Sequence, residues 1–214
     1  MAVDKRKYMD PDEVKTLQTV CEAWSLTDKQ KGRVTGVLTW MTVHAALGTG
    51  LRANEIAKLR VEAINLKKGT MLVVRSKKRK PAQETLPIGK ALQRHLREYL
   101  PWRAARIKSL APQYRKALTA TSGALLVGKK GGLGVQGIQR CFKRAAKRAG
   151  LPRTLSVHSC RHTLGTLLWR RTGDLRLVQA TLGHSSPAVT ANMYCHVEPE
   201  DIRKGLDDLY AVQG

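Results

Sequence analysis

His158-Ser159-Cys160-Arg161-His162 is the stretch that decides the fold class of this chain and the chemistry it can support. Leu182-Gly183-His184 follows it, and Tyr194 comes ten residues further on. Far upstream, Gly50-Leu51-Arg52-Ala53-Asn54-Glu55 supplies a second arginine, and Ser76-Lys77-Lys78-Arg79-Lys80 forms a basic turn. Two guanidiniums, two imidazoles, an ammonium and a phenol are the groups that chemistry on a phosphodiester requires when no metal ion takes part.

The charge of the chain indicates a polyanionic partner. Its 214 residues carry 39 Lys and Arg against 16 Asp and Glu, which gives a formal net charge of +23. Such an excess repels itself in isolation, and nucleic acid is the first candidate for the partner that neutralises it. A membrane surface is the second candidate, but the sequence has no apolar run near the ~20 residues of a spanning helix.

The length is typical of a single domain with its own core, and we expect one catalytic domain over residues 1–214. The N-terminus lacks the apolar stretch of a signal peptide, and the four cysteines show no C-x-x-C spacing. Reduced thiols in a cytoplasm are therefore expected rather than a disulfide framework.

Apolar residues recur mainly with helical periodicity. Asp10 as N-cap, Pro11 in the first turn and Glu13 closing a capping box predict the start of one helix. In the helix expected at 135–149, Val135, Ile138, Phe142, Ala145 and Ala149 mark a buried stripe, with Gly150 as its stop. The other helices are expected at about 34–48, 54–59, 92–99, 159–171, 174–182, 187–195 and 199–210.

Residues 70–88 change character and predict a β-hairpin. Thr70–Arg75 forms one strand, residues 76–83 a basic turn, and Glu84–Ile88 the returning strand. A further short strand is expected at Ala124–Val127, followed by a flexible loop at Gly128–Gly132. The predicted fold is therefore mainly α with a small antiparallel β-sheet, an α+β class.

Attack on a phosphodiester without a metal sets clear chemical requirements. Fixed cations must meet the charge that develops on the non-bridging oxygens, and arginine does this best because its planar fork pairs bidentately. Arg52 and Arg161 are the candidates. A lysine on the hairpin tip can protonate the leaving oxygen, and an imidazole can take the proton from the nucleophile. A tyrosine hydroxyl, with a reference pKa of ~10, needs such activation.

These motifs resemble the active-site pattern of tyrosine recombinases, the integrase family, over nearly the whole chain from about Met9. The resemblance implies the catalytic-domain fold of that family. It also implies a site-specific recombinase that cleaves and rejoins DNA strands through a covalent 3′-phosphotyrosyl intermediate, without a cofactor or a metal. In this comparison Tyr194 resembles the nucleophile, Arg52 and Arg161 the phosphate clamp, His158 the proton acceptor, and His184 the donor to a non-bridging oxygen.

The resemblance gives supporting roles to further residues. Lys77 resembles the general acid of the hairpin, with Lys78 in the same turn as the alternative. Glu55 resembles the family's supporting acid, and His162 is expected to pack beside the catalytic groups. DNA contact is expected from the hairpin tip and from the basic face of the helix at 135–149, through Lys78, Arg79, Lys80, Lys143, Arg144, Lys147 and Arg148. The alternative is that this helix face is merely solvated.

Other classes of protein compete with this interpretation. His158, Cys160, His162 and His184 raise the alternative of a zinc site, but structural zinc takes close ligand pairs and H-E-x-x-H requires a Glu. We therefore expect no metal, and a metal-dependent nuclease is the least favoured reading. A type IB topoisomerase-like enzyme that nicks and reseals, or a DNA-binding regulator that no longer cuts, would use the same fold.

The resemblance also implies how the protein assembles. Most family members carry an N-terminal core-binding domain, for which this chain leaves no room, so either an excised catalytic domain or a naturally short recombinase is expected. Ile202, Leu206 and Leu209 form a stripe on the helix at 199–210, which packs either in cis or on a neighbouring protomer. The implied partners are double-stranded DNA, further copies in a synaptic tetramer and accessory DNA-bending proteins. The implied location is the nucleoid of a prokaryotic cytoplasm, with a phage or mobile element as source.

Overall fold

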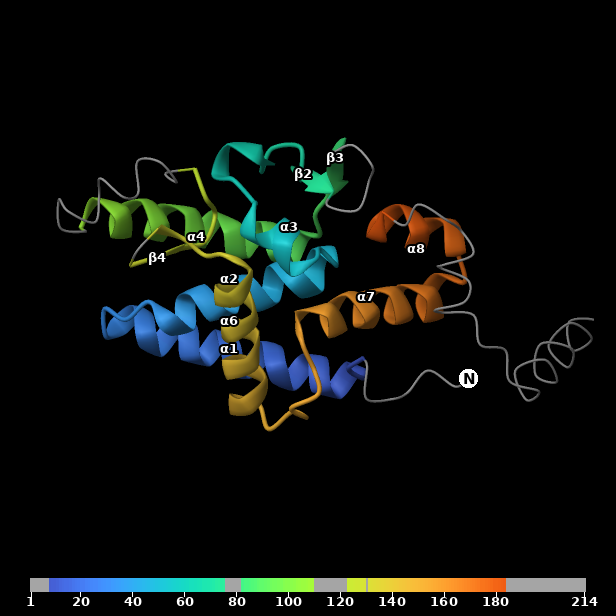
Figure 1. The fold of residues 1–214 in the computed structure, drawn as a ribbon, viewed down its shortest axis with the longest axis horizontal. Helices are drawn as coiled ribbons and strands as arrows, with labels where there is room; N and C mark the ends of the chain where they lie inside the picture. The colour runs from blue at the N-terminus through green and yellow to red at the C-terminus, as the bar shows by residue number, and fades with distance from the viewer. Residues whose placement is uncertain (1–7, 76–81, 110–122, 130, 184–214) are drawn as a thin grey trace, which may run out of the picture.

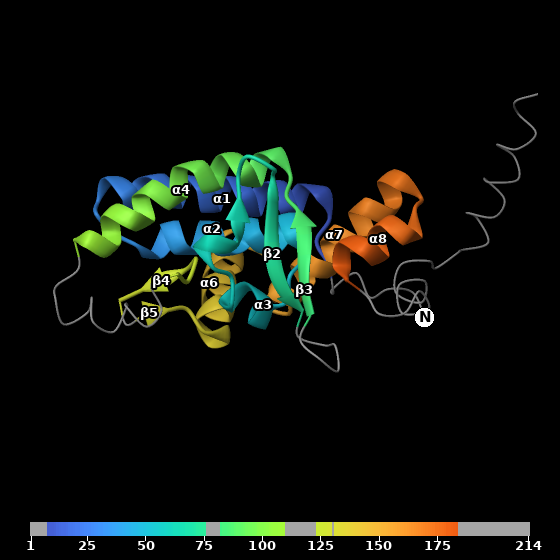
Figure 2. The same ribbon diagram turned by 90° about the horizontal axis from the view of Figure 1, so that it is seen from above.

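The fold is mainly helical with two small antiparallel sheets, as predicted (Figures 1 and 2). The structure, a computed structural model, describes residues 8–75, 82–109, 123–129 and 131–183. Its elements are, in chain order, α1 (Pro11–Gln30), α2 (Thr35–Thr49), α3 (Ala53–Ala57), the short 3-10 helix η2 (Val61–Ala63), β1 (Ile64–Asn65), β2 (Thr70–Arg75), β3 (Ala82–Pro87), α4 (Lys90–Lys108), β4 (Val127–Gly128), β5 (Gly131–Gly132), α6 (Val135–Arg148), α7 (Val157–Thr172) and α8 (Leu175–Leu182).

Helix α2 is the centre of the packing. Nearly all of its residues are buried, and α1, α3, α4, α6 and α7 all contact it. A helix with apolar residues on every side is stable only when it is buried in a core. Its buried hydroxyls at Thr42 and Thr49 donate to the carbonyls one turn earlier, Leu38 O at 2.7 Å and Ala45 O at 2.5 Å.

Three acidic side chains fix the starts of α1 and α2. The predicted capping box is confirmed: Asp10 Oδ1 accepts from Glu13 N at 2.8 Å, and Glu13 Oε2 accepts from Asp10 N at 3.0 Å. The cap of α2 comes from the preceding helix, because Asp28 Oδ2 accepts from Gly36 N at 2.7 Å. The carboxylate of Asp28 is thereby buried at the positive end of a helix, where a negative charge is favoured.

The larger sheet has the order β1-β2-β3 and is antiparallel throughout. Its register pairs Thr70 with Pro87 and Arg75 with Ala82. The first predicted strand is confirmed at its stated bounds, whereas the returning strand runs from Ala82 to Pro87 rather than from Glu84 to Ile88. The hairpin tip at 76–81 lies outside the described residues.

The segment predicted as a strand at Ala124–Val127 differs in the structure. Ala124 forms only an isolated bridge with Arg60, and of the predicted strand only Val127 lies in β4, while Gly128 and β5 lie where a loop was expected. Side chains take two carbonyls of this segment: Arg103 Nε donates to Ala124 O at 2.9 Å, and Tyr99 Oη donates to Leu125 O at 3.0 Å. Leu125 N and Leu126 O bond instead to the main chains of Leu59 and Leu133.

Helix ends account for the remaining differences. Helix α2 continues past Gly48 to Thr49 and is stopped by Gly50, and α4 continues through Pro101 to Lys108. In α6, Ile138, Phe142 and Ala145 are buried as predicted, but Val135 is 41% exposed because it lies in the first turn. The helices predicted at 187–195 and 199–210 lie outside the described residues.

Two buried histidines, which the sequence left without a role, lie on α2 and α4 and pack against each other. His44 Nδ1 lies 2.9 Å from His95 Nδ1, and both rings stack with Trp40 at centroid distances of 4.5 and 5.0 Å. Burial lowers the pKa of His44 to about 4. Burial, then the nearby charges of His44 and Lys29, lower the pKa of His95 to about 3. Both rings are therefore neutral in the folded protein at pH 7.

This pair predicts loss of stability in mild acid. The unfolded chain protonates both histidines below pH ~6.5, whereas the folded chain resists protonation until a much lower pH, so acid favours unfolding. Each histidine should contribute about 1.4 kcal/mol per pH unit in this window. Urea unfolding between pH 5.0 and 6.5 should show a shallower dependence on pH in His44→Gln than in the wild type. An unchanged slope would contradict the lowered pKa values.

The contact between α1 and α2 predicts a strongly destabilising substitution. A Cβ atom at Gly36 would lie 2.8 Å from both Trp24 Cδ1 and Trp24 O, and the main-chain oxygen cannot move without shifting α1. We expect Gly36→Ala to lower the free energy of unfolding by about 1–3 kcal/mol, measured with urea. Gly134→Ala is the matched control, because no atom lies within 4 Å of its added Cβ. Equal stability of the two variants would refute the close approach of the helices.

Candidate active site

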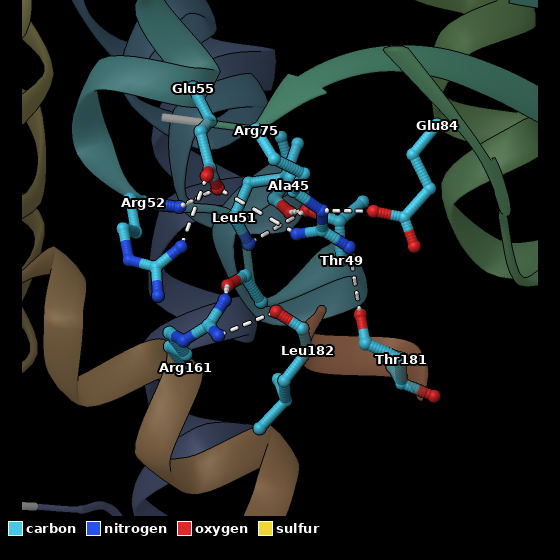
Figure 3. Close-up of polar contacts among 11 residues, drawn as sticks. Ala45, Thr49, Leu51, Arg52, Glu55, Arg75, Glu84, Arg161, Thr181 and Leu182 are labelled. Carbon is cyan, nitrogen blue, oxygen red and sulfur yellow. Dashed lines mark hydrogen bonds and ion pairs between the residues drawn. The ribbon is translucent and has the colours of Figure 1, made fainter. Parts of the chain in front are cut away.

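The loop after α2 places the first arginine. Gly50 ends α2 with a left-handed φ of 62°, and Arg52 is the N-cap residue of α3. Arg52 N donates to Glu55 Oε2 at 2.9 Å, and Arg52 Nη1 donates to Glu55 Oε1 at 3.1 Å (Figure 3). The Glu55 side chain is 0% exposed and that of Arg52 is 22% exposed. The buried carboxylate therefore orients a guanidinium that solvent can still reach.

The second arginine joins three segments. Arg161 on α7 donates from Nη1 to Gly50 O at 2.8 Å and from Nη2 to Leu182 O at 2.5 Å (Figure 3). Carbonyls at the end of a helix lack partners within that helix, and a cation is favourable there. Arg161 thus holds the C-terminus of α8 against the loop that carries Arg52, and it brings the two predicted clamp arginines to one place.

Helix α7 also carries the two predicted histidines near its start. Ser156 and Ser159 form a capping box there. The rings of His158 and His162 meet edge to face, with centroids 4.5 Å apart. His158 is exposed and lies three residues before Arg161, a spacing that puts the two on the same side of a helix. An imidazole therefore lies on the side of α7 that carries the buried guanidinium.

A third arginine lies in the same cluster, and the sequence analysis missed it. The Arg75 side chain, at the end of β2, is 2% exposed. Its Nε donates to Glu84 Oε2 at 2.9 Å, and its Nη2 donates to Thr181 O at 3.2 Å. Its Nη1 lies 3.7 Å from Glu55 Oε2, the oxygen that also accepts from Arg52 N (Figure 3).

The strand pattern contained a signal for this residue. Met71, Val73 and Arg75 alternate on one face of β2, and all three are buried. An arginine in the core-facing register of a strand needs an acid, and Glu84 supplies it from the diagonal position on β3, opposite Val73.

Two glycines allow the segments of the cluster to approach. At Gly50 an added Cβ would lie 2.7 Å from Leu182 Cδ2. Gly183 ends α8 with a φ of 62°, and its added Cβ would lie 2.8 Å from Arg75 Nε. Both positions combine a left-handed backbone with no room for a side chain, which explains the glycine in Leu182-Gly183-His184.

The predicted DNA-contacting residues of α6 have separate surroundings. Lys143 Nζ donates to Arg153 O at 2.6 Å and to Leu155 O at 2.7 Å, which ties α6 to the loop before α7. The guanidinium of Arg148 lies 4.8 Å from the centre of the Trp24 ring. Arg144 and Lys147 are exposed. The remaining predicted site residues lie outside the described part of the chain: Lys77, Lys78, Arg79, Lys80, His184 and Tyr194.

Two other kinds of site have no counterpart in the described part of the chain. Within residues 8–75, 82–109, 123–129 and 131–183, no three His, Cys, Asp or Glu side chains come together as a metal site. The helices in these ranges include none with the length and apolar character needed to cross a membrane. Cys21, Cys141 and Cys160 are free and buried, and burial raises the pKa of Cys21 to about 12.

The chain has sequence relatives that are named tyrosine recombinases. The chain is 34% identical over 157 residues to tyrosine recombinase XerD of Staphylococcus epidermidis (strain ATCC 35984), a match that covers 73% of this chain and 49% of the relative. It is 27% identical over 206 residues to XerD of Staphylococcus saprophyticus, with coverage of 96% and 64%. The chain thus spans about half to two thirds of the length of these relatives.

Solved structures show the same fold. The XerA recombinase superposes with a TM-score of 0.69 at 23% identity, covering 95% of this chain and 65% of that one. The Tn1549 transposon integrase in complex with transposon right end DNA gives a TM-score of 0.69 at 18% identity, covering 94% and 65%. The profile of the phage integrase family matches residues 7–201. The chain therefore belongs to the phage integrase family.

Proposed function

We propose that this chain is the catalytic part of a site-specific DNA recombinase, an enzyme that breaks and rejoins DNA strands through a covalent linkage to Tyr194. The observation that carries the proposal is the meeting of Arg52 and Arg161 around Gly50. Glu55 orients the first guanidinium, and the Gly50 and Leu182 carbonyls orient the second. Such preorganised positive charge matches what a phosphodiester under attack requires.

In the proposed mechanism Arg52 and Arg161 stabilise the charge on the non-bridging oxygens of the scissile phosphate. The Tyr194 oxygen attacks phosphorus, a Tyr194–phosphorus bond forms at the 3′ side, and the bond to the 5′ oxygen breaks. His158 accepts the phenolic proton, Lys77 protonates the leaving 5′ oxygen, and His184 donates to a non-bridging oxygen. The phosphotyrosyl bond preserves the energy of the broken phosphodiester, so a free 5′ hydroxyl can reverse the step without a cofactor.

The partners belong to the same proposal. Double-stranded DNA is supported by the net charge of +23 and by the exposed cations of α6. Related structures include XerH bound to a difH substrate and a lambda integrase dimer bound to a core site. By analogy we propose that residues 1–214 form one catalytic domain and that several copies assemble on DNA. The relatives named above are recombinases, which favours strand exchange over simple nicking and resealing.

The covalent step is the direct test. A pool of nicked suicide duplexes with randomised flanks, incubated with the protein in EDTA, should yield a covalent protein–DNA band on denaturing gels. Tyr194→Phe should abolish this band because it lacks the nucleophilic oxygen, whereas Tyr114→Phe should retain it. Sequencing of the captured DNA would then define the site.

The other outcomes of this assay separate the rival functions. Binding without any covalent band would indicate a regulator that does not cut, and loss of cleavage in EDTA would indicate a metal-dependent nuclease. Relaxation of supercoils without exchange between two sites would indicate a topoisomerase.

The general acid can be tested with a modified leaving group. A 5′-thiolate leaves without protonation, so a 5′-thio substrate should restore cleavage by Lys77→Ala. On the oxygen substrate the same variant should lose about 10²–10⁴-fold in rate. Lys78→Ala, from the same turn, is the matched control and should cleave both substrates alike. Recovery confined to Lys78→Ala would move the role to that residue.

A further inference from the structure

We propose that Arg75 is a positioning residue for both clamp arginines, acting on Arg52 through Glu55 and on Arg161 through the C-terminus of α8. The proposal deepens the recombinase function proposed above and rests on it. It concerns a residue that has no direct role in the chemical steps.

The route to Arg52 runs through one carboxylate. Glu55 Oε2 accepts from Arg52 N at 2.9 Å and lies 3.7 Å from Arg75 Nη1, while Glu55 Oε1 accepts from Arg52 Nη1 at 3.1 Å. The Glu55 side chain is 0% exposed, so its charge is held inside the protein by the two arginines. Without Arg75, the carboxylate loses a nearby guanidinium, and its orientation toward Arg52 is weakened.

The route to Arg161 runs through two consecutive carbonyls. Arg75 Nη2 donates to Thr181 O at 3.2 Å, and Arg161 Nη2 donates to Leu182 O at 2.5 Å. The last turn of α8 is therefore held from β2 and from α7 together. Gly183, which follows directly, has no room for a Cβ beside the Arg75 guanidinium. Removal of Arg75 should free one side of this turn and loosen the acceptor that fixes Arg161.

The two carboxylates that face Arg75, rather than its burial, argue for positioning, because Arg161 is also only 2% exposed. Its side chain is 2% exposed, and its three nitrogens face Glu84, Glu55 and the Thr181 carbonyl. Its Nε and Nη2 donate to protein oxygens, and its buried Nη1 lies in the 3.7 Å ion pair with Glu55, whereas Arg52 retains 22% exposure for a ligand. A residue that stabilised only the hairpin would need to contact only Glu84. Such a role does not explain the contacts of Arg75 with the carboxylate of α3 and with the end of α8.

The experiment compares charged and neutral substrates in single-turnover cleavage at saturating protein. We expect Arg75→Gln to form the Tyr194 adduct about 10²-fold more slowly than the wild type, because small displacements of catalytic groups have effects of this size. A methylphosphonate at the scissile position lacks the negative charge that the clamp must meet. The defect should therefore shrink to within about 3-fold on that substrate, as it should for Arg52→Ala.

The control variant removes the same charge elsewhere. Arg97→Gln, on the exposed face of α4, should cleave both substrates at the wild-type rate. In a double-mutant cycle, the defects of Arg75→Gln and Glu55→Gln should be less than additive, since the two variants share the route to Arg52 and differ only in the route through α8. Arg75→Lys keeps the buried charge if Arg75→Gln fails to fold. It should show the same pattern, because one ammonium cannot replace the three-way fork.

Each result has a stated meaning. Equal defects of Arg75→Gln or Arg75→Lys on the two substrates would assign Arg75 a purely structural role and overturn the proposal. A wild-type rate in Arg75→Lys, or full additivity with Glu55→Gln, would overturn it as well. If the wild type forms no adduct on either substrate, the recombinase function itself fails and this proposal fails with it.

Discussion

A guanidinium withdrawn from water must find acceptors on all sides, and this requirement shapes the site more than any other. Arg161 and Arg75 both donate to neighbouring carbonyls at the end of α8, a carboxylate of β3 accepts from Arg75, and the buried Nη1 of Arg75 is left with an ion pair of 3.7 Å to the carboxylate of α3. Strands β2 and β3, helices α3, α7 and α8 and the loop after α2 are consequently held in one arrangement. The clamp is a product of this packing as much as of the arginines themselves.

Helix α2 provides the support from which these contacts are made. It is buried on every side, and its C-terminal end leads into Gly50, whose carbonyl accepts from Arg161. Met9 N, just before α1, donates to Thr163 Oγ1 of α7 at 2.9 Å, so the helices that flank α2 are also linked to each other. The two clamp arginines therefore extend from packed elements, Arg52 from the start of α3 and Arg161 from α7.

Local signals predicted local structure well. The capping box at Asp10 and Glu13 and the alternation of Thr70–Arg75 depend on neighbours in the chain, and both were confirmed. Arg52, Glu55 and Arg161 were singled out by motif spacing, and the structure brings them together. The alternation of β2 marks Arg75 as core-facing, but the sequence could not reveal its contacts on α3 and α8, because these lie far away along the chain. The same limit hid the His44–His95 pair and the side-chain bonds that replace a strand at Ala124.

The partners of the buried arginines are largely main-chain oxygens: Gly50 O, Thr181 O and Leu182 O. Every amino acid supplies such an oxygen, so the acceptor at Thr181 persists whatever side chain evolution places there, provided that the helix ends at the same point. Only the donors of these contacts, the arginine side chains, depend on the residue type at their positions. Correlated substitution between aligned positions reveals many spatial contacts, but it cannot reveal these, because their acceptors do not depend on the side chain. The contacts of Arg75 and Arg161 with the end of α8 can therefore persist through extensive sequence divergence, while their acceptors leave almost no trace in the sequence.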